Sequence, residues 1–168
     1  MTGKGWSKFL KGDPMTWLML AAFLAACFVV AGIGGWFTSQ GLTEWYDGLV
    51  KPVFNPPSWV FAPVWTILYI LMGIAAWLVW KEAGWSGATA ALSLFFIQLL
   101  LNLAWSGLFF ALRSPGWALV EIIVLWAAIV ATTVLFFRHF TAAGVLMLPY
   151  LLWVTFAAVL NAALVRLN

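Results

Sequence analysis

Five apolar runs limit this chain to very few folds. They cover residues 15–39, 59–80, 87–112, 117–137 and 142–165. Each run can cross a hydrocarbon layer about 30 Å thick, because a helix rises about 1.5 Å per residue. The sequence is 65% hydrophobic and only 8% charged, so it lacks the polar surface of a water-soluble domain. We therefore expect an all-α, multi-pass integral membrane protein, with residues 1–168 forming one domain, a bundle of five transmembrane helices.

The same composition argues against several classes of function. The net charge is only +3 and no basic run is present, so nucleic acid is not an expected partner. Cys27 is the only cysteine and His139 the only histidine, so neither a disulfide framework nor a metal site built from these residues is available. No nucleophile stands beside a matching base in a way that suggests hydrolysis. We expect no metal and no intrinsic cofactor.

Loop charges predict the orientation in the membrane. The five basic residues on the N-terminal side are Lys4, Lys8, Lys11, Lys81 and Arg138, and the three on the other side are Lys51, Arg113 and Arg166. Since cytoplasmic loops carry the excess of lysine and arginine, the N-terminus is predicted to be cytoplasmic, in a bacterial membrane. The first run also resembles a signal peptide in its basic flank, but its length favours a membrane span.

Residues 40–58 form the one long connection, and prolines stiffen it. The stretch WYDGLVKPVFNPPSWVFAPVWTILY, residues 45–69, begins in this loop and ends inside the second apolar run. Proline fixes φ and restricts the residue before it, so Pro56 and Pro57 predict an extended connector, with Ser58 at the position of a helix N-cap. We interpret the loop as a stiff lid. An ordinary loop that needs its prolines only for turning agrees equally well with the spacing.

Polar residues in the runs gather in the half of the bundle beneath this loop. Because helix direction alternates, Trp65 lies about 9 Å, Asn161 about 10 Å and Asn102 about 15 Å from the loop side. Glu121 lies about 6 Å from the same side.

Helical spacing places these residues on shared faces. Gln98, Asn102 and Trp105 share one face of the third run, and Trp65, Tyr69 and Met72 share one of the second. Pro149, Trp153, Ala157 and Asn161 form a stripe on the fifth run, where the small residue leaves room for a bulky partner. The sequence therefore predicts a cavity lined by tryptophans and amides under the lid.

Each of these features also has a purely structural explanation. Buried Asn and Gln in membrane helices more often bond to a neighbouring helix than to a ligand. Glu121 near an interface is equally compatible with snorkelling, with a protonated carboxyl and with a functional role. The small-residue pairs Gly87/Ala91 and Ala127/Ala131 fit packing within the bundle as well as a dimer contact.

Four segments together resemble the tryptophan-rich sensory protein family, also known as the TspO or translocator-protein family and formerly as peripheral-type benzodiazepine receptors. They are the stretch at residues 45–69, FFIQLLLNLAWSGLFF, GWALVEIIVLWAAIVATTV and PYLLWVTFAAVLN. The runs W-Y-x-x-L-x-K-P-x-x-x-P-P and Q-x-x-x-N-x-x-W-S occur in order at the family's spacing. The likeness covers about residues 45–168, while the first run matches only in kind.

This resemblance implies a five-helix bundle, often a homodimer, that binds protoporphyrin IX or haem under its first loop. It also implies binding of sterols and of benzodiazepine-type or isoquinoline-carboxamide ligands. On the family pattern Trp45, Tyr46, Lys51 and Pro52 fall on the lid. Trp65 and Trp153 fall on the pocket tryptophans, and Asn102 and Trp105 on the polar wall. The full set of candidate ligand-binding residues is Trp45, Tyr46, Lys51, Pro52, Trp65, Tyr69, Gln98, Asn102, Trp105, Glu121, Trp153, Ala157 and Asn161.

Two departures from the family pattern are visible. Animal members carry a tyrosine directly after the asparagine of the fifth helix, within a proposed cholesterol motif, whereas Ala162 stands here. This departure weakens the case for sterol recognition by that motif and leaves sterol binding an open question. The extension over residues 1–14 carries three lysines and is a candidate contact for anionic headgroups.

Four functions agree with these features. The first is a receptor or sensor that binds tetrapyrroles and regulates porphyrin metabolism or a stress response. The alternatives are a light- and oxygen-dependent enzyme that degrades porphyrin, with Trp65 and Trp153 as the catalytic residues, a tetrapyrrole transporter, and a scaffold that docks on other membrane proteins. Transporters are often built from internal repeats, and five spans do not divide evenly into two.

Overall fold

The computed structural model describes residues 13–168, apart from the side chains of Thr43 and Glu44. This part of the chain is helical and contains no strand. In chain order the elements are α2 (Pro14–Gly41), η1 (Leu42–Tyr46), α3 (Ser58–Gly87), α4 (Thr89–Ser106), η2 (Gly107–Ala111), α5 (Pro115–His139) and α6 (Thr141–Leu167). The two η elements are short π-helical segments. The predicted all-α class is confirmed. The lysines at positions 4, 8 and 11 lie outside the described residues, so the orientation stays a prediction.

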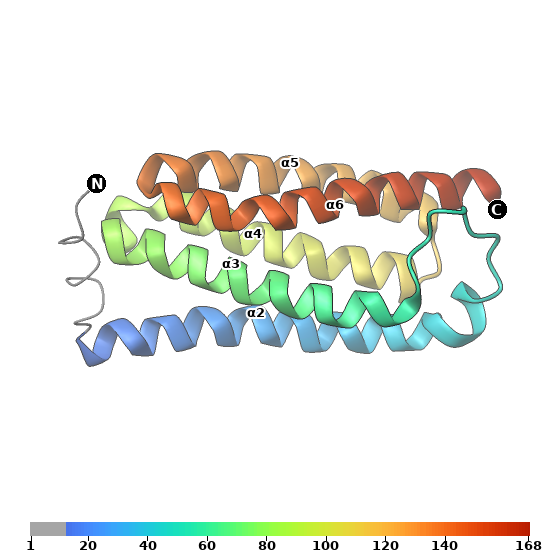
Figure 1. Cartoon of the computed structure of the whole chain (residues 1–168), viewed down its shortest axis with the longest axis horizontal. Helices are drawn as coiled ribbons and strands as arrows, with labels where there is room; N and C mark the ends of the chain where they lie inside the picture. The colour runs from blue at the N-terminus through green and yellow to red at the C-terminus, as the bar shows by residue number, and fades with distance from the viewer. Residues whose placement is uncertain (1–12) are drawn as a thin grey trace.

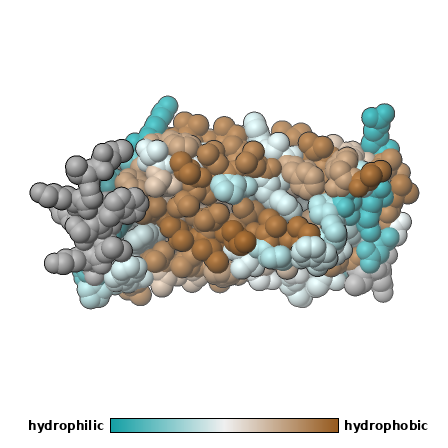
Figure 2. Space-filling model, viewed as in Figure 1, coloured by the Kyte–Doolittle hydropathy of each residue, from teal (hydrophilic) through white to brown (hydrophobic). Residues whose placement is uncertain are grey.

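Five helices in the described range are long and apolar enough to cross a membrane. Their hydrophobic residues cover most of the middle of the face seen in Figure 2, and hydrophilic residues gather mainly towards its two ends. A band of apolar surface with polar ends matches the slab of hydrocarbon between two headgroup layers. The expected five-span membrane bundle is therefore confirmed.

The helix bounds differ from the predicted ones at several places. The predicted loop over residues 40–58 is helical up to Tyr46, and Ser58, expected as an N-cap, is the first residue of α3, with Pro57 at the N-cap position. α3 continues to Gly87, beyond the expected end at residue 80, but Gly84 interrupts it with a φ of 66°. Glycine adopts this left-handed φ without the steric penalty of a side chain, so the chain changes direction there. The third run divides at residue 106, where α4 gives way to the π-helical η2. A π-turn carries one extra residue, so it rotates the side chains that follow it.

The helices run nearly parallel to one another along the long axis of the molecule (Figure 1). α5 packs against α4 and α6, while α2 packs against α3, α4 and η2. α3 also contacts α6. The loop between η1 and α3 crosses one end of the bundle and reaches the end of α6 (Figure 1). The two π-helical segments lie at that same end.

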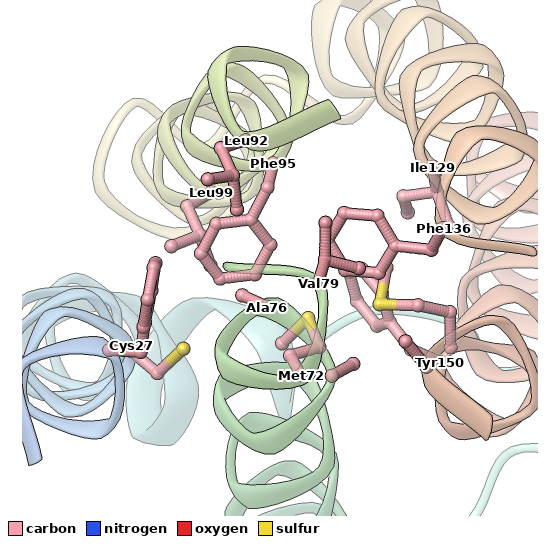
Figure 3. Close-up of a cluster of buried hydrophobic side chains, with 14 of the residues drawn as sticks. Cys27, Met72, Ala76, Val79, Leu92, Phe95, Leu99, Ile129, Phe136 and Tyr150 are labelled. Carbon is pink, nitrogen blue, oxygen red and sulfur yellow. The ribbon is translucent and has the colours of Figure 1, made fainter. Parts of the chain in front are cut away.

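The core is a continuous apolar cluster to which all five long helices contribute. Cys27 of α2, Met72 of α3, Phe95 of α4, Phe136 of α5 and Tyr150 of α6 are fully buried and turn towards one another (Figure 3). Phe95 and Phe136 stack with their ring centroids 6.1 Å apart. In lipid such close packing replaces the hydrophobic effect as the force that holds helices together.

Candidate functional site

A cavity of about 580 Å³ lies at the end of the bundle that the long loop crosses. Residues of α2, η1, α3, α4, η2 and α6 line it, whereas α5 contributes none. The volume falls within the range of about 300–1,000 Å³ found for small-molecule pockets. Its walls are mostly apolar, with a few polar side chains among aromatic rings, as is usual for such pockets.

Eight of the candidate ligand-binding residues line this cavity. They are Tyr46, Trp65, Tyr69, Asn102, Trp105, Trp153, Ala157 and Asn161. They come from four elements that are separated in sequence, so only the fold brings them together. Their role in binding stays a prediction, but their convergence on one hollow space is a fact of the structure.

The other five candidates lie outside the cavity walls. Trp45 packs edge-on against Phe109, with the ring centroids 5.4 Å apart. Pro52 is half-buried in the loop. Lys51 approaches the site only indirectly, because its Nζ lies 4.7 Å from the centre of the Tyr46 ring and 3.2 Å from Asp47 Oδ1.

Gln98 and Glu121 are the two candidates whose positions differ most from the predicted cavity wall. Gln98 is fully buried, and its Nε2 approaches Met72 Sδ at 3.9 Å, while its Oε1 has no partner among the described residues. Glu121 belongs to α5, the one long helix that does not border the cavity. Both carboxyl oxygens of Glu121 are buried and have no hydrogen-bond partner among the described residues.

Aromatic rings form most of the cavity wall. Trp65 contacts the Tyr69 ring, with centroids 5.6 Å apart. On α6, Trp153 lies 5.6 Å from Phe156 and meets Phe61 of α3 edge-on at 6.0 Å. Aromatic pairs at these separations stabilise one another by more than the burial of their surface alone provides. The cavity therefore offers fixed, flat surfaces to a ligand.

The two asparagines of the wall are held by hydrogen bonds between helices. Tyr69 Oη donates to Asn102 Oδ1 at 2.7 Å. Asn161 Oδ1 accepts from Trp105 Nε1 at 3.2 Å, and Asn161 Nδ2 donates to the Pro115 carbonyl at 2.8 Å. Hydrogen bonds of this kind join helices in a membrane. Both amides thus hold the bundle together and still border the cavity.

Several lining residues were not predicted from sequence. α2 contributes Gly34, Gly35 and Thr38, and η2 contributes Phe109 and Phe110. The glycines of α2 were a usable signal, because glycine leaves space beside a helix. The two phenylalanines gave none, because their direction depends on the π-helical turn and not on residue type.

No group of three His, Cys, Asp or Glu side chains in the described part of the chain is placed to hold a metal ion. The cavity lining contains no His, Cys or Met side chain. A haem bound here would therefore find only oxygen-bearing side chains as possible iron ligands.

The loop over this end of the bundle is attached at both of its flanks. Burial raises the pKa of Tyr46 above its ordinary value, and the neutral phenol donates to Asn55 Oδ1 at 2.8 Å. Farther along, Asn168 binds the loop backbone twice. Its Oδ1 accepts from the Val50 amide at 2.9 Å, and its Nδ2 donates to the Val50 carbonyl at 3.1 Å. One side chain at the end of α6 thus makes two hydrogen bonds to the loop backbone, and Phe54 of the loop also meets Phe156 of α6 edge-on at 6.4 Å.

We expect Asn168→Ala to loosen the loop without unfolding the bundle. Each exposed hydrogen bond contributes about 0.5–1.5 kcal/mol, so losing two should speed hydrogen exchange at the Val50 amide by roughly tenfold or more. Exchange measured by mass spectrometry tests this, with Arg166→Ala on the same turn as the control. Equal protection of Val50 in the Asn168 variant would mean that other contacts hold the loop.

Comparison with known proteins agrees with this architecture. The TspO/MBR family model matches residues 23–167. The tryptophan-rich protein TspO of Archaeoglobus fulgidus is 42% identical over 154 residues, which cover 92% of this chain and 99% of that protein. The tryptophan-rich sensory protein of Cereibacter sphaeroides is also 42% identical, over 92% and 94% of the two chains. The human translocator protein is 40% identical, over 90% and 91%.

Proposed function

This chain belongs to the TspO/MBR family, and we propose that it is a membrane receptor that binds a tetrapyrrole in the cavity beside the long loop. One observation carries the proposal: a cavity of about 580 Å³ whose walls hold Trp65, Trp105 and Trp153. A flat conjugated ring gains both apolar burial and stacking on such walls. The relatives named sensory protein and translocator protein support a receptor role in a membrane.

Protoporphyrin IX suits this site better than haem held through its iron. The lining offers aromatic rings and amides but no His, Cys or Met side chain. Those three residue types, together with tyrosine, are the ordinary protein ligands of haem iron. The two tyrosines of the lining already use their hydroxyls in hydrogen bonds, Tyr46 to Asn55 and Tyr69 to Asn102. Binding of a metal-free porphyrin needs only stacking and hydrogen bonds.

A titration tests the proposal. Purified protein in detergent is titrated with protoporphyrin IX in the dark while tryptophan fluorescence is followed. Saturable quenching with one site per chain supports the receptor. Quenching that does not saturate, or that is unchanged when both Trp65 and Trp153 are replaced with alanine, would contradict it.

A second candidate function is light- and oxygen-dependent degradation of the bound porphyrin. The observation that favours it is the place of Trp65 and Trp153, which line the same cavity from different helices. An indole close to an excited porphyrin is a possible electron donor. Illumination of the saturated complex in air, with an anaerobic sample as the control, separates the two functions. Loss of the porphyrin spectrum only in air and light supports the enzyme, and an unchanged spectrum supports the receptor.

We expect Lys51→Gln to weaken the binding of protoporphyrin IX more than the binding of its neutral dimethyl ester. Lys51 is half-buried above Tyr46, which lines the cavity, so its ammonium lies close to where a propionate would emerge. An exposed charge pair contributes up to about 1 kcal/mol, which corresponds to a loss of about fivefold or less for the acid. The ester should lose little.

Asp47 provides the matched control for this prediction. Its carboxylate holds the Lys51 ammonium at 3.2 Å, so Asp47→Asn frees the cation and should strengthen binding of the acid. The measurement is the ratio of the two dissociation constants in each variant. If both ligands change by the same factor in both variants, Lys51 does not meet a propionate.

A further inference from the structure

Three side chains from three helices form one hydrogen-bonded chain at the deep end of the cavity. Tyr69 Oη on α3 donates to Asn102 Oδ1 on α4 at 2.7 Å, and Asn102 Nδ2 donates to Tyr150 Oη on α6 at 3.0 Å. Tyr69 and Asn102 line the cavity. Tyr150 does not line it and is completely buried.

The direction of this chain leaves one proton without an acceptor. Tyr150 accepts from Asn102, but its own O–H donates to no group among the described residues. A buried donor without a partner is costly. If the Asn102 amide turns by half a rotation, Tyr150 donates to Oδ1 and Nδ2 donates to Tyr69. The Tyr69 O–H no longer donates to Asn102 and is free to donate to a group in the cavity, which Tyr69 borders.

The surroundings allow this reversal without movement of a helix. Trp65 contacts both phenol rings, at 5.6 Å from Tyr69 and 6.2 Å from Tyr150, so the two tyrosines stay in place. Only the flat amide has to turn, and a phenol serves equally well as donor or acceptor. The two directions therefore use the same atoms at nearly the same positions.

We propose that Tyr150 is a positioning residue that lets the Tyr69–Asn102–Tyr150 chain run in either direction. In the direction seen, Tyr69 offers the cavity an oxygen that accepts a hydrogen bond. In the reversed direction it offers a donor. The site thus accepts flat apolar ligands whose single polar group is either a hydroxyl or a carbonyl. This inference rests on the proposed function in one respect, that the ligand occupies this cavity.

Three probes that share one flat skeleton test the proposal: fluorene, 9-fluorenol and 9-fluorenone. Their dissociation constants are measured by quenching of tryptophan fluorescence in the full-length protein. In the parent protein the alcohol and the ketone should bind within about threefold of each other, and both more tightly than fluorene. In Tyr150→Phe the dissociation constant of the ketone should rise by about tenfold, while those of the alcohol and of fluorene stay the same.

The reason lies in the reversed direction. In the parent protein, turning the Asn102 amide gives the buried Tyr150 hydroxyl an acceptor, and a ketone benefits from that gain. With phenylalanine at position 150 the gain is lost, because either orientation of the amide leaves one of its buried atoms unpaired, Nδ2 in the direction seen and Oδ1 in the reversed one. The alcohol uses the direction that the variant retains. Thr133→Val removes another buried hydroxyl, which bonds to the Ile129 carbonyl of α5 away from the cavity, and should change none of the three constants.

Tyr69→Phe is the second variant and keeps the test decisive if Tyr150→Phe folds poorly. It removes the end of the chain that meets the ligand, so the alcohol and the ketone should both fall to the affinity of fluorene. Unchanged ketone binding in Tyr150→Phe, or equal weakening of ketone and alcohol binding, overturns the proposal that the hydrogen-bonded chain reverses. If protoporphyrin IX binds the parent protein and none of the three probes does, the proposed reversal alone is wrong. If no ligand binds at all, the proposed reversal and the proposed function fail together.

Discussion

Replacing Gly41 with alanine is expected to destabilise the bundle by about 1–3 kcal/mol and to weaken ligand binding. A Cβ at this position would lie 2.5 Å from the Phe110 carbonyl oxygen and 3.1 Å from two further backbone atoms of Phe110. Backbone cannot move aside as a flexible side chain does, so the end of α2 and η2 must separate. Leu42, Tyr46 and Phe110 all line the cavity, and their displacement alters its shape.

Gly35→Ala is the matched control for Gly41→Ala. It lies on the same helix, and a Cβ there meets no atom within 4 Å. Its stability should stay the same or rise slightly, since alanine favours a helix by about 1 kcal/mol over glycine. The comparison is the unfolding temperature of each variant in the same detergent. A Gly41 variant as stable as the Gly35 variant would show that the close contact between the end of α2 and η2 is not needed.

Replacing Trp65 or Trp153 with alanine should produce the largest loss of porphyrin affinity. Each indole lines the cavity and is held by a second aromatic ring, Trp65 by Tyr69 and Trp153 by Phe156. Truncation of such an anchor typically costs about 2 kcal/mol or more, which is roughly 30-fold in Kd. Titration with protoporphyrin IX in the dark measures the effect. Trp117→Ala, on an exposed residue outside the cavity, is the control and should bind as the parent protein does.

The corresponding phenylalanine variants separate binding from photochemistry. Phenylalanine keeps an aromatic surface but is much harder to oxidise than indole, so Trp65→Phe and Trp153→Phe should lose only a few-fold in affinity. If the protein degrades porphyrin, light-driven loss of the porphyrin spectrum should slow sharply in these variants while binding persists. If it is only a receptor, the bound spectrum is stable in the parent and in both variants. Variants that bind and bleach like the parent would limit these tryptophans to packing.

Much of the candidate site could be found from sequence because depth in a membrane helix is a local property. The rise per residue places Trp65, Asn102 and Asn161 in the same half of the bundle, and the cavity lies there. Shared faces at spacings of three and four add Tyr69 and Trp105. The same reasoning failed to separate Gln98 from Asn102, which share a face of α4, because it does not say where a hollow space ends. Gln98 is packed against Met72 below the cavity.

Contacts between elements account for the rest of the differences. Lys51, expected at the mouth of the cavity, does not line the wall itself but pairs with Asp47 and covers the ring of Tyr46, which does line it. Glu121 has the right depth, yet α5 does not border the cavity, so depth alone misplaced it. The two-way bond between Asn168 and Val50 joins residues 118 positions apart in the sequence, which no spacing rule indicates.

The sequence by itself determined the five membrane spans, the all-α class and the end of the bundle at which polar and aromatic residues meet. These follow from segment length, hydropathy and helical period, which each residue carries with it. Only the tertiary structure decided which wall α2 provides and which helix is left out of the cavity. It also decided that Phe109 and Phe110 of η2 line the cavity, and that Tyr150 stands behind Asn102. Those features depend on how each helix rotates against its neighbours, and that rotation is set by close packing and interhelical hydrogen bonds in a lipid environment.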